Sequence, residues 1–245
     1  MKEVLYTIPL NDAINKGGEC PFCNIEKDVE QDLLDFVLGS GSSYMEADVR
    51  ATTDAEGFCR PHFKKMFAYG NTLGNAWILK THYMKTNKEL KSLFEKYTPS
   101  KTSIKDMFSK NTESRNPVVN YLENREESCY ICKRFNETYE RYLATFVHMY
   151  RNDEEFKNKV FSGKGFCLSH FKDLCKYADN ELSEKEKKEF YPRMFKLMEE
   201  NMQRLQEDVA WMVEKFDYKN KDADWKNSKD AIQRGMQKLK GGLYD

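Results

Sequence analysis

The sequence has no long apolar run. No stretch approaches the roughly 18 apolar residues of a membrane span, and residues 1–20 contain no apolar segment of the length that a secretory leader needs. We therefore expect a cytoplasmic protein without a membrane span. In a reducing compartment, cysteines bind metal or do redox work more often than they form structural disulfides.

Net charge is also absent, because 40 basic residues balance 40 acidic ones in a chain of 245. This balance argues against a surface built to hold nucleic acid and against a polybasic membrane binder. The last twenty residues are an exception, with five basic side chains: Lys226, Lys229, Arg234, Lys238 and Lys240. Nucleic-acid binding through this tail stays open as a minor alternative.

Several catalytic signatures are missing as well. The sequence contains no HExxH, no glycine-rich phosphate loop, no nucleophile elbow and no dinucleotide fingerprint. No segment keeps strand-like alternation for long, so we expect a mostly α fold. The chain is long enough for one large domain or two smaller ones.

What the sequence does contain is a repeat built around cysteine. The stretch GFCRPHFKKMFAYGN at 57–71 returns as GFCLSHFKDLCKYADN at 165–180. Each is preceded by a Cys-x-x-Cys pair, CPFC at 20–23 and CYIC at 129–132, and the intervals between pair and repeat are 35 and 34 residues. The shared order and spacing predict an internal duplication.

The duplication predicts two helical modules. We expect an N-terminal module at 1–97, a linker at 98–126, a C-terminal module at 127–217 and a tail helix within 218–245. Apolar residues at three-and-four spacing follow CPFC and CYIC, which predicts an amphipathic helix after each pair. Each Cys-x-x-His should open a further helix, and a long helix should close each module, with an apolar stripe from Phe190 to Phe216 in the second.

The cysteine and histidine pairs predict two zinc ions per chain. Zinc takes four ligands at tetrahedral corners, and a Cys-x-x-Cys with a Cys-x-x-His makes a closed Cys₃His set. We expect one site in each module. The first would be Cys20, Cys23, Cys59 and His62. The second would be Cys129, Cys132, Cys167 and His170.

Other interpretations of the pairs stay open. Mononuclear iron or an iron–sulfur cluster is a less favoured alternative to zinc. Iron–sulfur clusters are usually held by four cysteines and not by three cysteines and a histidine. A thioredoxin-like redox pair would need a βαβ pattern around it. Cys175, His82 and His148 have no repeated partner, so we expect them to be ordinary core or surface residues.

The tail has no counterpart in the first module. We expect Trp225 to dock it onto the helical modules, with Ile232, Met236 and Leu239 on one face of a short helix and a basic face opposite. If a ligand or partner groove exists, Trp225, Lys229 and Arg234 should lie near its rim.

The doubled CxxC…GFCxxHF pattern, with the DWKNSKDAIQRGMQKL tail, resembles an uncharacterised bacterial family known only as a domain of unknown function. The resemblance covers nearly the whole chain and implies no mechanism. Some relatives carry the label of an ABC-transporter substrate-binding protein. We do not expect that role here, since no signal peptide or lipoprotein motif accompanies the pattern.

Four functions are compatible with these features. The first is a zinc-stabilised helical binding or scaffold protein for an unknown protein or small-molecule ligand. The second is a thiol or metal sensor, in which thiolates release zinc on oxidation. A metal-dependent enzyme is less favoured, because catalytic zinc normally keeps one position for water. Nucleic-acid binding through the tail is the fourth.

Overall fold

A computed structural model describes residues 4–41, 43–98 and 116–243. These parts of the chain form eleven α-helices and no strand, which confirms the predicted mostly α fold. Within the described residues, no helix is both long and apolar enough to cross a membrane. The helices are grouped into two compact units, one built from 4–29 and 137–243 and the other from 30–136 with its gaps.

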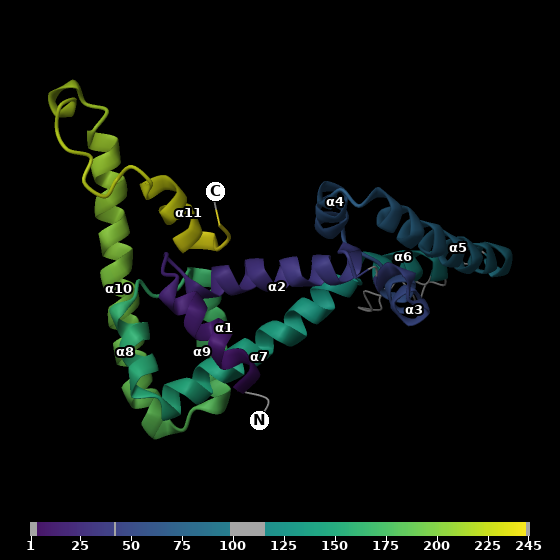
Figure 1. Ribbon diagram of the computed structural model, residues 1–245, viewed down its shortest axis with the longest axis horizontal. Coiled ribbons are helices and arrows are strands. Elements are labelled where there is room, and N and C mark those ends of the chain that lie inside the picture. The colour runs from purple at the N-terminus through teal and green to yellow at the C-terminus, as the bar shows by residue number, and fades with distance from the viewer. Residues whose placement is uncertain (1–3, 42, 99–115, 244–245) are drawn as a thin grey trace, which may run out of the picture. The chain divides into compact units, whose positions relative to one another are not determined.

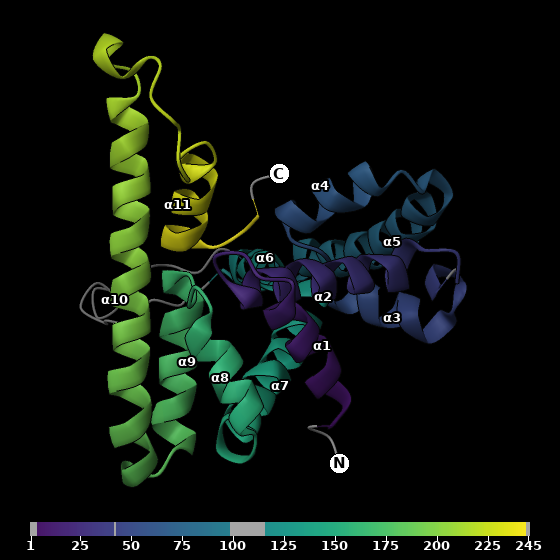
Figure 2. The ribbon, with the colours of Figure 1, turned by 60° about the vertical axis from the view of Figure 1, so that its left-hand side comes forward.

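Unit 1 contains the first helix and the C-terminal half of the chain (Figure 1). Its own helices are α1 (Val4–Asn15), α8 (Glu154–Ser162), α9 (Leu168–Glu181), α10 (Glu184–Glu214) and α11 (Ala231–Lys240), with a short 3-10 turn η3 (Tyr218–Asn220). Figure 2 shows α9 and α11 lying along α10, and Phe171 of α9 packs edge-on against Phe195 of α10 with ring centroids 6.3 Å apart.

Unit 2 contains the helices that lie between α2 and α7 in the chain. They are the 3-10 turn η1 (Ser43–Met45), α3 (Ala47–Glu56), α4 (Arg60–Tyr69), α5 (Thr72–Lys96) and α6 (Pro117–Glu127). Its core includes Phe58, Met66, Ile78 and Ile131, all buried. Pro61 occupies the first turn of α4, where a missing N–H costs no hydrogen bond, and Gly70 ends the helix in a left-handed conformation.

Two helices belong to both units. The first turns of α2 (Pro21–Leu38) lie in unit 1 and its last turns in unit 2, whereas α7 (Tyr130–Asn152) begins in unit 2 and continues in unit 1. The structure therefore does not divide at the boundaries expected from the repeat, 1–97 and 127–217. Each unit takes helices from both sequence modules. Of the expected linker, 99–115 lies outside the described residues, and 117–127 is helical.

The core of unit 1 is aromatic and lies around the start of α2. The Phe22 ring packs against Phe146 and Phe166, with centroids 6.0 and 5.8 Å away, and Phe146 packs against Phe156 at 5.3 Å. The predicted stripe on α10 is buried at Phe190 and Leu205 and becomes exposed toward Phe216. Burial of these rings is the main apolar stabilisation of unit 1.

Candidate metal centres

Four ligand-type side chains converge in unit 1, and we call them the unit 1 site. They are Cys20, Cys23, Cys167 and His170. The His170 Nδ1 lies 3.3 Å from the Cys20 Sγ, 3.6 Å from the Cys23 Sγ and 3.1 Å from the Cys167 Sγ. All four side chains are almost fully buried, none more than 2% exposed.

A second set converges in unit 2, the unit 2 site. Its members are Cys59, His62, Cys129 and Cys132. The His62 Nδ1 lies 3.1, 3.3 and 3.4 Å from the sulfurs of Cys59, Cys129 and Cys132, and the Cys59 and Cys132 sulfurs are 3.7 Å apart. Cys59 and Cys132 are only half-buried, so this set is more open than the first.

The eight predicted residues thus form two Cys₃His groups, but the predicted pairing is wrong. Each Cys-x-x-Cys joins the Cys-x-x-His of the other module: 20/23 with 167/170, and 129/132 with 59/62. The two pairs of each type are chemically equivalent, so spacing alone cannot distinguish them. The fold decides the matter, because Cys20 and Cys23 lie in the same compact unit as Cys167 and His170, whereas Cys59 and His62 lie in the other.

Both groups have the dimensions of a tetrahedral metal site. Zinc bonds of about 2.3 Å to sulfur and 2.0–2.1 Å to nitrogen give S···S edges of about 3.8 Å and S···N edges of about 3.6 Å. The observed S···N distances of 3.1–3.6 Å and the S···S distance of 3.7 Å are close to these edges. All seven cysteines are free thiols, so no disulfide competes for the sulfurs. Both groups could hold a metal ion.

Backbone geometry explains why the repeat keeps its glycine and cysteine. Gly57 and Gly165 have φ of 67° and 73°, and a Cβ on Gly165 would lie 2.9 Å from the Met198 sulfur. Only glycine meets both demands without strain. The cysteine two residues later is the N-cap of α4 or α9. The Cys167 sulfur accepts a hydrogen bond from the His170 amide in the first turn of α9, which favours a thiolate.

Two carboxylates that no sequence motif indicated hold the histidines. The His170 Nε2 lies 3.0 Å from Glu26, and the His62 Nε2 lies 3.0 Å from Glu30. Such a bond directs Nδ1 toward the metal and raises the basicity of the ring. Both glutamates lie on α2, at i and i+4. No repeated residue marks them, so only their position after CPFC could have suggested them.

The ligand side chains of the unit 2 site have strongly shifted pKa values. Hydrogen bonds with Cys129 and Glu30 raise the pKa of His62 to about 10. Burial acts to raise the pKa of Cys129, but hydrogen bonds from His62 and from backbone amides outweigh it and lower that pKa to about 6. Burial raises the pKa of Cys132 to about 12. A bound dication must displace these protons, so metal affinity should fall as the pH falls.

The three predicted rim residues of the tail have different surroundings. Arg234 is largely buried and bonds Asp208 at 2.9 Å. Trp225 is half-buried, with the Lys215 amine 5.1 Å from its ring centre, and Lys229 is exposed. The tail helix is docked in unit 1 through part of its basic face. Arg234 and Lys238 point inward because the buried Glu19 lies beneath them, and Ile232, Met236 and Leu239 remain about half exposed.

The three unrepeated candidates belong to neither group. Cys175 is half-buried, and burial raises the pKa of its thiol to about 11, which disfavours the thiolate. The His82 Nε2 lies 3.2 Å from the Arg125 guanidinium. His148 is exposed on α7, and the interpretation of all three as ordinary residues stays a prediction.

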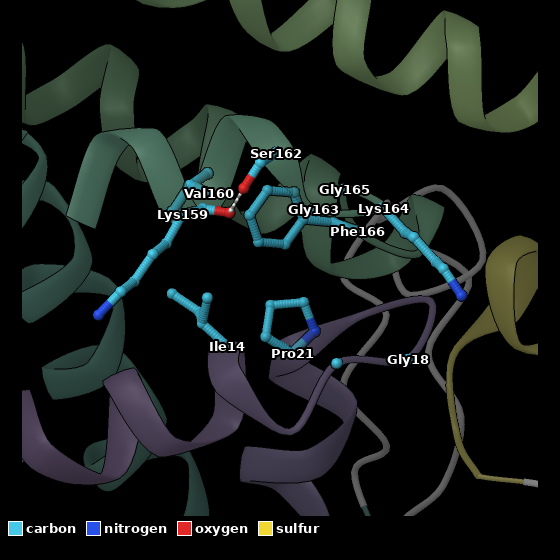
Figure 3. A pocket seen from close by; sticks show the side chains of 11 residues that line it. Ile14, Gly18, Pro21, Lys159, Val160, Ser162, Gly163, Lys164, Gly165 and Phe166 are labelled. Carbon is cyan, nitrogen blue, oxygen red and sulfur yellow. Dashed lines mark hydrogen bonds between the residues drawn. The ribbon is translucent and has the colours of Figure 1, made fainter. Parts of the chain in front are cut away.

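A cavity of about 240 Å³ lies beside the loops that carry the unit 1 ligands. In Figure 3, Ile14 and Pro21 line one side and Val160 and Phe166 the other, while the amines of Lys159 and Lys164 point away. The walls are mainly apolar and glycine-rich, and Pro21 and Phe166 are next to Cys20 and Cys167 in the chain. We assign no chemistry to this cavity.

Comparison with known proteins identifies the chain by family. Neither the curated proteins nor the solved structures contain a match to it. A family model does match, over residues 1–245, and it carries the description Family of unknown function (DUF6062). The chain, with its two Cys₃His groups, therefore belongs to the Family of unknown function (DUF6062).

Proposed function

We propose that both groups hold zinc and that the protein is a zinc-stabilised helical scaffold. The observation that carries the proposal is the convergence of eight ligand atoms into two sets with tetrahedral edge lengths. Three thiolates and an imidazole are ligands that zinc prefers, and Cys₃His is a common structural zinc set. The glutamate behind each histidine supports metal binding, because such outer carboxylates accompany metal-bound imidazoles.

The complete ligand sets favour a structural role over a catalytic one. Catalytic zinc normally has three protein ligands and leaves the fourth position to water. Here four protein atoms fill each set, and each joins segments that are far apart in the sequence. Zinc would therefore hold together the start of α2 with α9 in unit 1, and α4 with the start of α7 in unit 2.

Metal analysis tests the zinc proposal directly. Protein purified without chelator should carry two zinc ions per chain, measured by mass spectrometry of the digested sample. One ion or none would contradict the proposal. A brown chromophore with acid-labile sulfide would show an iron–sulfur protein instead.

A groove between α10 and α11 supports the scaffold part of the proposal. It has a volume of about 430 Å³ and apolar walls that include Met202, Leu205, Val209 and Leu239. Apolar clefts of this size take small molecules or side chains of a partner. Native mass spectrometry of the purified protein tests this use, since a co-purifying molecule would appear as a constant mass increment.

The alternative is a thiol or metal sensor, and one observation favours it. Cys59 and Cys132 of the unit 2 site are half-exposed, in contrast to the buried sulfurs of unit 1. Accessible zinc thiolates can be oxidised with loss of the metal. If the protein is a sensor, mild peroxide should release one zinc ion per chain and leave the other bound.

A further inference from the structure

The two sites share ligands but differ in what covers them. In unit 1 every ligand is at most 2% exposed, whereas two of the three cysteines in unit 2 are reachable from solvent. The C-terminal residues 231–243, which we call the C-terminal cover, belong to unit 1 and reach its sulfurs at Gly241.

The closest part of the C-terminal cover is Gly241. A Cβ at this position would lie 3.3 Å from the Cys167 sulfur and 3.8 Å from the Cys23 sulfur. Gly241 therefore lies beside two of the three sulfurs of the unit 1 site. Its φ of 83° also suits only glycine. The next residue, Gly242, has nearly the same φ of 81°, but nothing lies within 4 Å of its Cβ position.

A buried lysine holds the C-terminal cover in place. Lys238 is 1% exposed, and its amine donates to the backbone carbonyls of Glu19 at 2.8 Å and Lys164 at 2.5 Å. Glu19 directly precedes the first ligand, Cys20, and Lys164 lies three residues before Cys167. One amine thus connects the cover to both ligand-bearing loops of the unit 1 site.

Further contacts attach α11 to the same place. The Ser169 hydroxyl donates to the Lys240 carbonyl at 3.3 Å, within the first turn of α9. The Arg234 guanidinium bonds Asp208 at 2.9 Å and lies 3.5 Å from the buried Glu19 carboxylate. If α11 moved away, the buried carboxylate of Glu19 would lose its partners, which costs free energy. We therefore expect the cover to be held firmly.

We propose that the C-terminal cover closes the unit 1 site to metal exchange, and that the unit 2 site is the one through which the protein exchanges metal with its surroundings. The proposal rests on the zinc assignment above. A chelator removes protein-bound zinc by forming its own bond before the last protein ligand leaves, so it needs a path to the metal. Gly241 lies beside the sulfurs on the outer side of the unit 1 site, whereas Cys59 and Cys132 of unit 2 are only half-buried.

The test is zinc release from the full-length, zinc-loaded protein into excess 4-(2-pyridylazo)resorcinol, followed by absorbance. We expect two phases of one zinc each, differing at least about tenfold in rate, which corresponds to about 1.4 kcal/mol between the two barriers. Maleimide labelling of the same sample, located by peptide mass spectrometry, should modify Cys59 and Cys132 before Cys20, Cys23 and Cys167.

Two glycine variants distinguish the effect of contact with the site sulfurs from the effect of backbone strain. Gly241→Ala should speed the slow phase by about tenfold or more and leave the fast phase unchanged, because its methyl group pushes against the Cys167 sulfur. Gly242→Ala is the matched control, with equal strain and no contact with sulfur. Circular dichroism establishes that both variants keep the helical fold.

Three results would overturn the proposal. They are release of both zinc ions at one rate, first labelling in unit 1, and equal slow-phase rates in the two glycine variants. The zinc content measured before chelation tests the metal assignment separately. A chain that holds two ions of another divalent metal would contradict the zinc assignment, and the same rate comparison would then test the cover with that metal.

Discussion

Each metal-site histidine uses its second nitrogen to hold a glutamate of α2. Counted from CPFC and CYIC, the positions equivalent to Glu26 and Glu30 in the second repeat are Phe135 and Tyr139. Tyr139 nevertheless lies beside a site histidine, with its ring centroid 5.6 Å from that of His170. The repeats therefore share their metal ligands but not the residues that orient them.

Glu26→Gln and Glu30→Gln should each weaken one site only. Loss of the carboxylate lowers the basicity of the imidazole, and we expect metal affinity at that site to fall by about 10–100-fold. Competition with a chromophoric chelator measures the affinities. The pKa of Glu30 is held below its usual value by its bond to His62, so this carboxylate is ionised throughout the neutral range.

The matched control is Glu140→Gln, an exposed position on α7 with the same change of charge. It should leave both affinities unchanged. Equal losses at both sites in either α2 variant would show that the glutamates act through general charge and not through their own histidine.

At the scale of single helices, α10 begins with a capping box that also binds α7. The Ser183 hydroxyl and the Glu186 carboxylate satisfy each other's backbone amides, and Arg151 of α7 bonds Glu186 at 2.7 Å. This arrangement starts the longest helix of the structure at a defined residue and attaches it to the unit 1 core.

Glu186→Gln should lower the free energy of unfolding by about 0.5–1 kcal/mol, a small value because the pair is near the surface. Hydrogen bonds from Arg151 and Ser183 lower the pKa of Glu186 from 4.5 to about 2. A lowered pKa contributes stability above the unfolded value, which is lost as the pH falls from 4.5 toward 2. Urea unfolding of both proteins should thus give the same difference from about pH 5 to about pH 8. A difference that varies across this range would contradict the assignment.

Each Cys-x-x-Cys shares a site with the Cys-x-x-His of the other repeat, and we call this the exchanged pairing. It predicts which cysteine variants destabilise the same helices. Cys20→Ser should destabilise the same helices as Cys167→Ser, and Cys59→Ser the same as Cys129→Ser, because each pair shares a site. Hydrogen exchange with mass spectrometry should show lost protection in 137–243 for the first pair and in α3 to α5 for the second.

Cys175→Ser provides the control, since this half-buried thiol belongs to neither group. It should leave protection in both units close to that of the unchanged chain. If Cys20→Ser instead affected the same helices as Cys59→Ser, the ligands would be paired within each sequence module and the exchanged pairing would be wrong.

For the whole molecule, metal removal should matter more than any single side chain. A structural zinc contributes about 10–16 kcal/mol of apparent binding free energy, against about 5–15 kcal/mol for the net stability of a typical protein. Treatment with a chelator should therefore reduce the helical circular dichroism and the melting temperature strongly, and added zinc should restore both. An unchanged melting temperature after verified metal loss would contradict a structural role.

Local chemistry made part of this protein predictable from its sequence. The helix starts at CPFC, CYIC and both Cys-x-x-His pairs, the repeat and all eight Cys and His residues could be identified, because helical spacing, capping and ligand spacing each depend on neighbours within a few residues. The glutamates behind the histidines could not, because each meets its partner only after α2 has packed against α4 or α9.

The pairing of the sites depends on the tertiary structure. The sequence determined that two Cys-x-x-Cys pairs and two Cys-x-x-His pairs would each supply half of a site, but these halves are chemically interchangeable. Only the folded chain decided between them, because each unit gathers one Cys-x-x-Cys and the Cys-x-x-His of the other repeat into its own core. The inward face of α11 was decided in the same way, by the buried Glu19 that Arg234 and Lys238 must reach.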